Sequence, residues 1–491
     1  MATDLPPAPA AVAPDAPGLR RNALGTGGIV FLVVAAAAPL TVMAGVAPLA
    51  LLVGGIGAPA GYLAAGVVLT IFAVAFTAMT KHVGSAGAFY SYVTRGLGQT
   101  AGLAAAVLAL VSYSGLQVGV YGLLAQQTQA TLLDVLGISL PWPVIALVGI
   151  AIVTAVCWFG IEVGAKVLGV LLVAETAILA LMAGGVIAEG GAEGLSGGSF
   201  AVGNLTGPGM AAILALCFAA FMGFESTAIY RSEARRPERT IPRATYIAVG
   251  FMAIFYCVVV WSVVQAFGEA GVQGTAAANL PGLFFEVIAT YVGPWAATLM
   301  QLLVVSSVLA SQIAFHNAVT RYALALSEDG VLPAGAGRLH PRHQSPTTAG
   351  LVQSGIAALA VVAFGLAGAD PFRGLLVWIN TPAVVGVLLL QVLTAVSVVV
   401  FFTRADRPAR HPVAVVAGVL SAVLLAVATA LLVDNVSLLT ATESSANWIV
   451  VGIVPVVLVV GVVVARWLKG AKPEVYARVG RGTVPTAEAH S

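Results

Sequence analysis

The chain has 491 residues and a net charge of +2; 59% of the residues are hydrophobic and only 9% are charged. Soluble domains carry about 25% charged residues. This composition, with a mean hydropathy of +1.01, therefore excludes a soluble enzyme, a disordered chain and a nucleic-acid-binding protein. Long continuous apolar runs, such as residues 144–159, are typical of membrane-spanning helices rather than of the alternating strands of a membrane β-barrel. The sequence predicts an all-α integral membrane protein.

Twelve apolar stretches are long enough to cross a bilayer, which takes about 20 apolar residues. In chain order they cover residues 28–54, 58–80, 99–126, 142–160, 165–188, 207–230, 241–267, 289–320, 347–367, 374–402, 411–433 and 446–467. A short helix near residues 283–288 is expected before the eighth span. The Pro- and Ala-rich residues 1–21 are expected to form a disordered arm, and residues 468–491 a second tail.

The basic residues test this number of spans. All but Arg373 of the 22 Lys and Arg residues lie in the two tails or in the loops that follow even-numbered spans. Cytoplasmic loops of membrane proteins are enriched in Lys and Arg. Both termini are therefore predicted to be cytoplasmic, in a multi-pass protein of the cell membrane. A missed or additional span would invert every later loop and destroy this asymmetry.

The cysteines indicate neither a disulfide framework nor a metal site. They lie within spans 4, 6 and 7, at Cys157, Cys217 and Cys257, so none is placed in an outer loop. No group of residues has the spacing of metal ligands. No cofactor, metal or nucleic acid is therefore expected.

Span 1 is interrupted by proline and glycine. Pro39 lacks a backbone donor and disfavours helix at the residue before it, and Gly45 and Pro48 follow. A break near Thr41–Gly45 would free backbone amides and carbonyls at mid-membrane, where such groups are tolerated only if they line a cavity or bind something. A simple proline kink, satisfied by neighbouring helices, is the alternative.

Span 6 carries a carboxylate near its middle. Glu225 follows Gly223, which allows the backbone to unwind, and a carboxylate inside a span indicates function. If spans 1–5 and 6–10 are repeats, these two interruptions correspond, and such a pair marks the central site of a transporter. Free amides at a half-helix N-terminus suit a carboxylate, and free carbonyls suit an ammonium or a cation. A zwitterionic amino acid has both groups.

Three motifs resemble those of one known family. Residues 84–98 (GSAGAFYSYVTRGLG), 221–244 (FMGFESTAIYRSEARRPERTIPRA) and 323–333 (ALALSEDGVLP) are similar to motifs of the amino acid–polyamine–organocation permeases. The resemblance covers about residues 22–467, the expected permease domain. It implies the leucine-transporter fold, with a 5+5 inverted repeat over about 28–188 and 207–402 and two extra helices within 411–467. It also implies alternating access to a site between helices 1, 3, 6, 8 and 10.

The resemblance carries the family's substrate site onto two unwound segments of this chain. In helix 1 the corresponding residues are Thr41, Val42, Met43, Ala44 and Gly45. This chain has MAG there, whereas the family usually has a glycine–serine–glycine type motif. In helix 6 the segment is Ala219–Phe224, including Gly223. Of the rings of helix 6, Phe218, Phe221 and Phe224, the resemblance favours Phe221 or Phe218 as a gate over bound substrate; core or lipid packing is the alternative.

Polar residues of helices 3 and 10 are further candidates. Tyr113, Gln117 and Tyr121 are spaced by four, which places them on one helix face. That face is expected to line the pathway or to bond a neighbouring helix. Helix 10 offers the same choice at Trp378, Asn380 and Thr381. The central helices contribute no Lys or Arg, which disfavours dicarboxylates and favours neutral amino acids or amines.

Glu175, in span 5, is the second carboxylate inside a span. By the resemblance it aligns where several proton-coupled or sodium-independent relatives have a lysine. Four roles stay open for it: carrying a coupled proton, holding Na⁺ with helix 1 carbonyls and Ser307 or Ser311, pairing with a substrate amine, or bonding a neighbouring helix. Glu225 belongs to the family motif and is expected to hold the broken segments or the gate, with coupling as the lesser option.

The sequence therefore predicts a secondary active transporter of an amino acid, with a neutral substrate and proton coupling favoured. An amino acid/polyamine exchanger and a non-transporting amino-acid sensor of the same fold are the alternatives. An enzyme is disfavoured because no paired catalytic set lies at one membrane depth. The expected partners are the amino acid or amine, a proton or sodium ion, and the lipid bilayer. No obligatory protein partner is expected.

Overall fold

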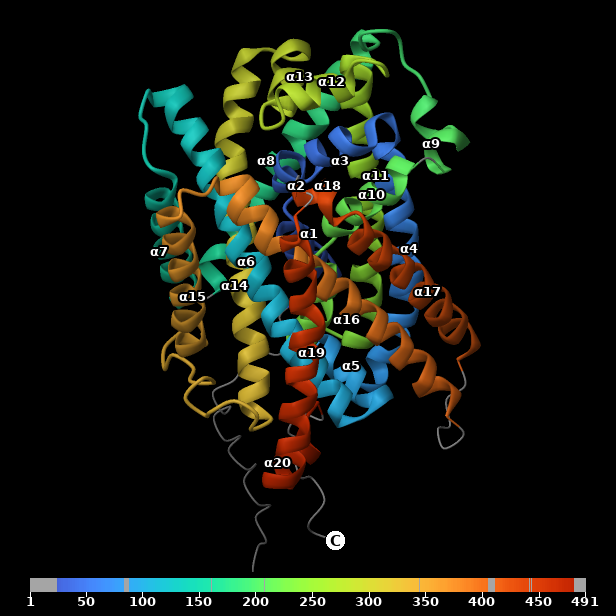
Figure 1. Cartoon of the computed structure of the whole chain (residues 1–491), viewed down its shortest axis with the longest axis vertical. Helices are drawn as coiled ribbons and strands as arrows, with labels where there is room; N and C mark the ends of the chain where they lie inside the picture. Colours follow the sequence, from blue (N-terminus) through green and yellow to red (C-terminus); the bar gives the residue numbers. More distant parts are fainter. Residues whose placement is uncertain are drawn as a thin grey trace, which may run out of the picture.

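The computed structural model describes residues 24–83, 88–159, 161–206, 208–343, 345–404, 411–440, 442 and 444–480. Within these ranges the regular structure is helical, apart from two isolated β-bridges, Leu24–Ala234 and Leu339–Pro346. The helices form one bundle (Figure 1). The predicted arm 1–21, residues 84–87 of the first motif and residues 481–491 of the tail lie outside the described residues.

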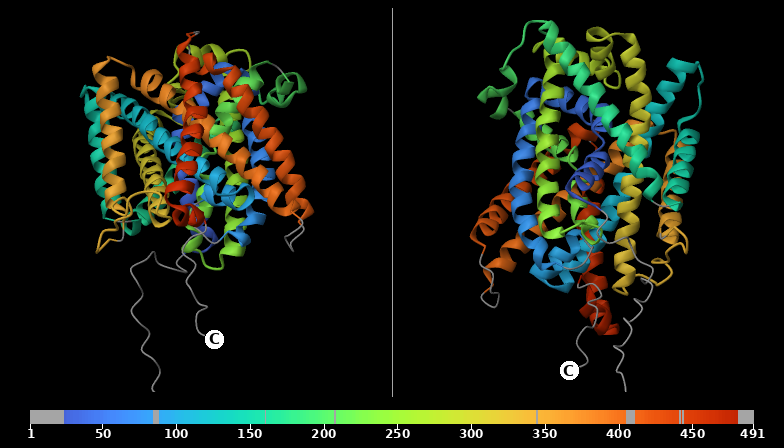
Figure 2. Two further views of the ribbon diagram at one scale, coloured as in Figure 1. Left: turned by 60° about the horizontal axis from the view of Figure 1, so that its bottom comes forward. Right: turned by 180° about the vertical axis from the view of Figure 1, so that it is seen from behind.

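Different short helices cover the two ends of the bundle (Figures 1 and 2). Helices α5 (Ala88–Leu97) and α20 (Pro473–Arg478) lie at one end, which we call the terminal face. Helices α9 (Val202–Thr206), α12 (Val272–Ala278) and α13 (Leu283–Tyr291) lie at the opposite end, the distal face. Helix α13 confirms the short helix expected before the eighth span.

Eleven of the described helical segments are long and apolar enough to cross a membrane. They are Thr26–Gly45, Ala47–Met79, Gln99–Leu136, Gly169–Glu189, Gly209–Ala228, Pro237–Phe267, Pro294–Glu328, Thr347–Leu366, Pro371–Thr403, Pro412–Asp434 and Ala446–Ala471. The predicted fourth span corresponds to α7 (Trp142–Trp158), which has 17 residues. At about 1.5 Å per residue α7 is about 26 Å long, less than the about 30 Å of a hydrocarbon core. A multi-pass helical protein is confirmed, with eleven long spans and one shorter apolar helix where twelve spans were predicted.

Several helices continue beyond the apolar stretches that predict them. Helix α6 runs over Gln99–Leu136, ten residues past the predicted end, and buries Gln127 and Thr131 in that extension. Within the extension Thr131 Oγ1 donates to the Gln127 carbonyl at 2.8 Å, so this buried hydroxyl is satisfied by the helix backbone itself. The other long helices are α4 (Ala58–Met79), α8 (Ile161–Glu189), α11 (Pro237–Phe267), α14 (Pro294–Glu328), α15 (Thr347–Leu366), α16 (Val377–Thr403), α17 (Pro412–Asp434) and α19 (Ala446–Ala471).

Span 1 is broken three residues before the predicted position. Helix α1 (Thr26–Ala37) ends at Ala38, whose φ of 46° lies in the left-handed region, and α2 (Pro39–Gly45) begins at the next residue. Pro39 causes this because its ring disfavours helical geometry at the residue before it. The predicted unwound stretch Thr41–Gly45 is instead helical. It is followed almost without interruption by α3 (Ala47–Gly54), since the Val46 amide still donates to the Val42 carbonyl at 2.8 Å.

Span 6 is broken where the sequence predicts. Helix α10 (Pro208–Ala219) ends at the start of the expected segment, a turn follows, and the chain continues as the 3₁₀ helix η4 (Phe224–Ser232). Gly223, between them, has a φ of 109°, which a residue with a side chain rarely adopts. The glycine therefore allows α10 to end and η4 to begin within one turn.

Close packing holds the spans together where small residues face one another. A Cβ built on Gly66 of α4 would lie 2.2 Å from the Cβ of Ala253 on α11, and one built on Gly461 of α19 would lie 2.6 Å from the Cα of Ala104 on α6. In a bilayer such contacts replace the hydrophobic driving force between helices. They fix the helices that flank the two broken spans.

Candidate functional site

The two helix breaks lie against each other. A Cβ built on Gly223 would lie 3.5 Å from the Cβ of Ala36 and 3.7 Å from the amide nitrogen of Ala37, in the last turn of α1. Ala38, the break in span 1, is the next residue. The interruption of span 6 and that of span 1 thus share one location inside the bundle, as a central site between these helices requires.

Glu175 lies beside the first break. It is midway between Ile161 and Glu189 on α8 and is 2% exposed. Ser307 of α14 donates a hydrogen bond from Oγ to Glu175 Oε2 at 2.7 Å. The Thr41 amide donates to Ser307 Oγ at 3.2 Å, and the two hydroxyl oxygens are 3.0 Å apart. Three elements, α8, α14 and α2, therefore meet in one chain of hydrogen bonds.

The local structure explains why Thr41 takes part in this chain. Pro39 opens α2, so the Thr41 amide lies in the first helical turn, where backbone N–H groups have no intrahelical acceptor. Ser307 supplies that acceptor and donates its own hydroxyl hydrogen bond to Glu175. Ser311, one turn further along α14, is buried but has no hydrogen bond to Glu175 among the described residues. Of the predicted residues Thr41, Glu175, Ser307 and Ser311, the structure brings the first three into one hydrogen-bond chain, with Ser307 between the other two.

Glu225 lies at the second break and bonds close to its own position. Both carboxylate oxygens accept from the Gly223 amide, at 3.2 and 3.1 Å, and Tyr113 of α6 donates its hydroxyl to Oε1. The Tyr113 ring also stacks on Tyr322 of α14, with centroids 5.5 Å apart. The carboxylate thus fastens the turn before η4 to α6.

Gln117 links the polar face of α6 to α14. Its Nε2 lies 3.2 Å from Nδ1 of His316 and 3.4 Å from the Tyr121 hydroxyl, and its carbonyl accepts from Gln312 Nε2 at 3.1 Å. Its own Oε1 is buried without a partner among the described residues. The predicted face of α6 therefore contacts two different groups, with Tyr113 at Glu225 and Gln117 at His316.

The aromatic rings of span 6 pack mainly against α4 and α11. Phe221 is edge-on to Tyr256 at 5.9 Å, and Phe224 is edge-on to Phe72 at 6.0 Å. Phe218 is buried and has no ring partner among the described residues. Of the two rings favoured as a gate, Phe218 is therefore the one that aromatic stacking does not hold.

The remaining predicted residues are buried between helices. Val42, Met43, Ala44 and Gly45 lie in α2, and a Cβ built on Gly45 would lie 2.9 Å from Leu123 of α6. Ala219 is the last residue of α10 and is half-buried. On α16, Thr381 donates to the Val377 carbonyl, and Asn380 packs against Gly119 of α6. Trp378 is half-buried.

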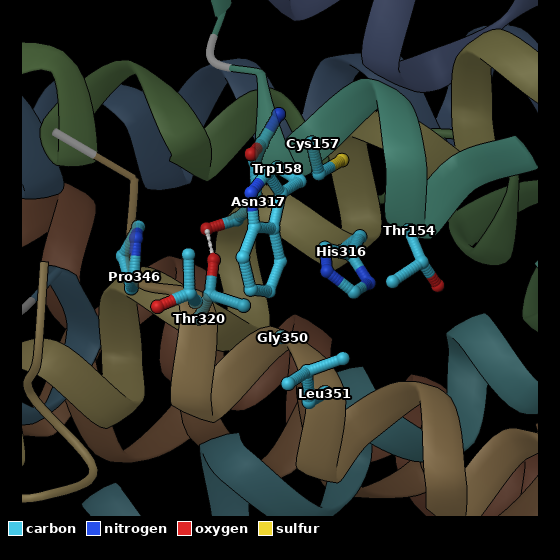
Figure 3. Close-up of a pocket in the computed structure, with 10 residues that line it drawn as sticks. Thr154, Cys157, Trp158, His316, Asn317, Thr320, Pro346, Gly350 and Leu351 are labelled. Atoms are coloured by element: carbon cyan, nitrogen blue, oxygen red, sulfur yellow. Dashed lines mark hydrogen bonds between the residues drawn. The ribbon is translucent and has the colours of Figure 1, made fainter. Parts of the chain in front are cut away.

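Two features escape the sequence analysis because they join distant segments. His316 is 2% exposed and forms one wall of a pocket between α7, α14 and α15, shown in Figure 3. An ionisable residue within an apolar span is the signal that could have found it. The second feature is an ion pair at the terminal face, Arg321 to Glu233, with Nη1 and Oε1 2.7 Å apart. Nothing in the spacing of these two residues predicts their contact.

The ion pair belongs to a set of contacts that close the terminal face. The Arg321 guanidinium lies 5.1 Å from the centroid of the Tyr230 ring. The Leu24 amide donates to the Glu233 carbonyl at 2.9 Å, and the Arg235 amide donates to the Leu24 carbonyl at 2.7 Å. The start of α1, the end of η4 and α14 are therefore tied together below the two breaks.

Most of the chain matches one known protein family. Residues 28–476 match the family model described as amino acid permease. The chain belongs to the amino acid permease family. The permease is 29% identical over 247 residues to an uncharacterized transporter of Mycobacterium tuberculosis and equally to one of Mycobacterium bovis; the match covers 48% of this chain. The chain thus spans about half the length of these relatives, 54%.

A further relative carries a substrate in its name. The permease is 22% identical over 141 residues to the branched-chain amino acid permease BcaP of Bacillus subtilis, a match over 29% of each chain. The names of these relatives, a transporter and a permease, agree with the family shown by the matching family model.

Proposed function

We propose that this permease is a secondary active transporter that moves a neutral amino acid across the cell membrane by alternating access, coupled to protons through Glu175. The observation that carries the proposal is the hydrogen-bond chain from Glu175 through Ser307 to Thr41. It connects a carboxylate at the middle of one span to the first turn after the break of another.

Protonation of Glu175 would rearrange this chain. In the ionised state Ser307 accepts from the Thr41 amide and donates to the carboxylate. A protonated Glu175 can itself donate a hydrogen bond to Ser307 Oγ. The Ser307 hydroxyl is then free to donate to Thr41 Oγ1, 3.0 Å away. The proton thereby alters the support of α2 beside the substrate site. Na⁺ bound by the same oxygens and a substrate amine paired with Glu175 are the competing interpretations.

The meeting of the two breaks supports an amino acid as substrate. Half-helix ends offer backbone amides and carbonyls, which match the carboxylate and ammonium that all amino acids share. Glu225 is already bonded to the Gly223 amide and Tyr113, so we assign it to holding the second break. We also propose that the five-helix sets beginning with spans 1 and 6 form the inverted repeat, whose two first spans carry the breaks.

We further propose that the terminal face is cytoplasmic. Arg231, Arg235, Arg236, Arg239 and Arg243 follow the second break, and positive loops face the cytoplasm. Leu24 and α20 then place both ends of the described chain on that side. The ion pair Arg321–Glu233 closes the pathway from within.

Uptake into proteoliposomes of the purified protein tests the proposal. Labelled amino acids and polyamines are offered with and without an inward proton gradient. Gradient-stimulated accumulation of a neutral amino acid is the expected result. Uptake that requires a preloaded lumen would identify an exchanger. Thermal stabilisation by an amino acid without any flux would identify a sensor, and both outcomes would overturn the proposed symport.

A further inference from the structure

A pocket in the half of the bundle near the terminal face ends at His316. Its volume is about 20 Å³, enough for about one water molecule, and its walls come from α7, α14 and α15 (Figure 3). His316 Nδ1 lies 3.2 Å from Gln117 Nε2. A Cβ built on Gly350 of α15 would lie 3.0 Å from Nε2. The second imidazole nitrogen therefore faces the pocket, where no described residue bonds to it.

The pocket has the chemistry to hold water. Thr154, Asn317, Thr320 and Thr347 contribute polar side chains to its lining, and a polar cavity of this kind supplies the partners that a buried water needs. Buried imidazole nitrogens are normally hydrogen-bonded, and a water in the pocket would supply the partner for Nε2. His316 lies about 14 Å beyond Ser307 along α14, at about 1.5 Å per residue, toward the terminal face.

We propose that His316 exchanges protons with water that enters this pocket from the terminal face, and that the Gln117 carboxamide rotates when the charge of the imidazole changes. This inference rests on the proposed proton coupling. With Nδ1 accepting from Gln117 Nε2, the neutral imidazole carries its hydrogen on Nε2 and donates it to pocket water. Rotation of the Gln117 carboxamide presents Oε1, which otherwise has no described partner, to Nδ1. This favours the tautomer with its hydrogen on Nδ1, whose Nε2 then accepts a proton from pocket water to give the imidazolium. The reverse transfer returns the proton to water.

Few other ionisable groups surround His316. Among the described residues, α6 contributes Tyr121, which bonds to Gln117, and α7 contributes Cys157, which lines the pocket. Helix α15 contributes Thr347, Gly350 and Leu351, none of which titrates. No carboxylate or cation is among the described residues that line the pocket, so the charge of His316 would dominate there.

The test varies the pH on the terminal-face side of oriented proteoliposomes. Histidine titrates at about pH 6.5 in water and at lower pH when it is buried, so wild-type efflux should change about threefold or more as the pH on that side is lowered from about 7 to about 4. His316→Gln should flatten this dependence while the response to pH on the distal side, assigned to Glu175, is kept. An undiminished terminal-side dependence in His316→Gln would overturn the inference. If wild-type efflux did not respond to the pH on the distal side, the proposed coupling through Glu175 would be overturned instead.

Two further measurements separate this role from a structural one. Gly350→Val keeps His316 but fills the space beside Nε2, and it should also flatten the terminal-side dependence. Gly355→Val, on the same helix, has open space at its Cβ and should leave the dependence unchanged. Cys157 is a second reporter, because a small charged thiol reagent added at the terminal face should label it in the wild type and more slowly in Gly350→Val. Equal labelling would show that the pocket is not the inlet.

A different observation concerns the C-terminal segment, which docks on the terminal face. The Tyr476 hydroxyl lies 2.7 Å from Thr100 Oγ1 at the start of α6, and Val475 packs on Gly330. Val479 is fully buried. The segment 473–480 therefore occupies a formed site between α5, α6 and the end of α14.

Asp329 forms the centre of this contact. Its Oδ2 accepts from the Gly480 amide at 2.9 Å and from the Tyr90 hydroxyl of α5 at 3.1 Å. Burial raises the pKa of Asp329 above its usual value, while these two donors favour the charged form. Gly480 has a φ of 70°, and a Cβ there would lie 2.6 Å from Thr94 Oγ1. Only glycine therefore allows its amide to reach Asp329.

A line of rings leads from Asp329 to the second helix break. The Tyr90 ring lies 6.4 Å from that of Tyr322, which stacks on Tyr113 at 5.5 Å. Tyr113 donates to Glu225, which holds the Gly223 turn. We infer that residues 473–480 form a latch that restrains the transport cycle through these contacts.

Gly480→Pro tests the latch because proline removes the amide donor and cannot adopt the observed φ. Loss of a hydrogen bond to a charged group should raise the maximal uptake rate about threefold to tenfold. Ala477→Ser, at an exposed position of α20, is the matched control and should not change the rate. Truncation after Arg478 should act as Gly480→Pro does and should also increase hydrogen exchange in residues 323–333. An unchanged or lower rate in both variants would overturn the latch.

Discussion

Glu175 and Glu225 are both buried carboxylates beside a broken helix, but their partners come from different parts of the chain. Glu225 bonds to the amide two residues before it and to one tyrosine. Glu175 bonds through Ser307 to Thr41, far away in the sequence, on two other helices. A carboxylate that accepts from a backbone amide of its own segment stabilises a local turn. A carboxylate that joins three helices through hydroxyl groups can change their contacts when it gains a proton.

The largest effect is expected at the second break itself. Gly223→Ala should lower uptake about tenfold to a hundredfold, because a φ of 109° strains any residue with a side chain by about 1–3 kcal/mol. The Cβ itself would make ordinary contacts, the nearest at 3.5 Å, so the effect isolates the backbone. Initial uptake rates are compared at equal membrane expression.

Gly250→Ala is the control for this variant. Gly250 lies within α11, with open space at its Cβ and no unusual φ, so alanine should be neutral or stabilising there by about 0.5–1 kcal/mol. Normal uptake by Gly223→Ala would remove the unwound turn from the account.

Glu225→Gln should reduce uptake about tenfold yet keep the response to a proton gradient. The amide retains an acceptor for Gly223 but loses the charge, which weakens these hydrogen bonds by about 1–2 kcal/mol. Uptake is measured with and without the gradient. If the gradient response disappeared while uptake persisted, the assignment of the two carboxylates would have to be exchanged.

Ser307→Ala should have a smaller effect, a loss of about threefold to tenfold in gradient-driven uptake, because it removes the link between Glu175 and Thr41 at about 1 kcal/mol per hydrogen bond. Ser311→Ala is the matched control on the same helix and should leave uptake unchanged, since Ser311 is buried without a hydrogen bond to Glu175 among the described residues. Equal effects of the two variants would contradict a specific chain of hydrogen bonds.

The sequence predicts the break in span 6 better than that in span 1. In span 6 one glycine before a carboxylate defines the turn, and its φ follows from the local chain. In span 1 the strain caused by Pro39 falls on Ala38, so residues 41–45 regain a helix that the proline and glycine pattern predicts to be unwound. Local chemistry predicts that a break exists, but its position depends on whether the residues before or after the proline depart from helical geometry.

Contacts between helices were the least predictable part of the site. The sequence offers Ser307 or Ser311 as a ligand of Na⁺ beside Glu175, but which of the two serines reaches Glu175 depends on the rotation of α14 against α8. The contact between His316 and Gln117 and the pair Arg321–Glu233 also depend on how distant helices pack. Composition and spacing define the faces of a helix, but not which neighbouring helix each face meets.

The most direct test of the account is uptake by Glu175→Gln in proteoliposomes with and without an inward proton gradient. Glutamine preserves the shape and the acceptor for Ser307, so substrate binding, measured by thermal stabilisation, should be retained. Glutamine cannot take up the proton, so stimulation by the gradient should be lost and downhill uptake should become independent of the pH on the distal side. Gradient stimulation equal to that of the wild type would contradict the assignment of proton coupling to Glu175.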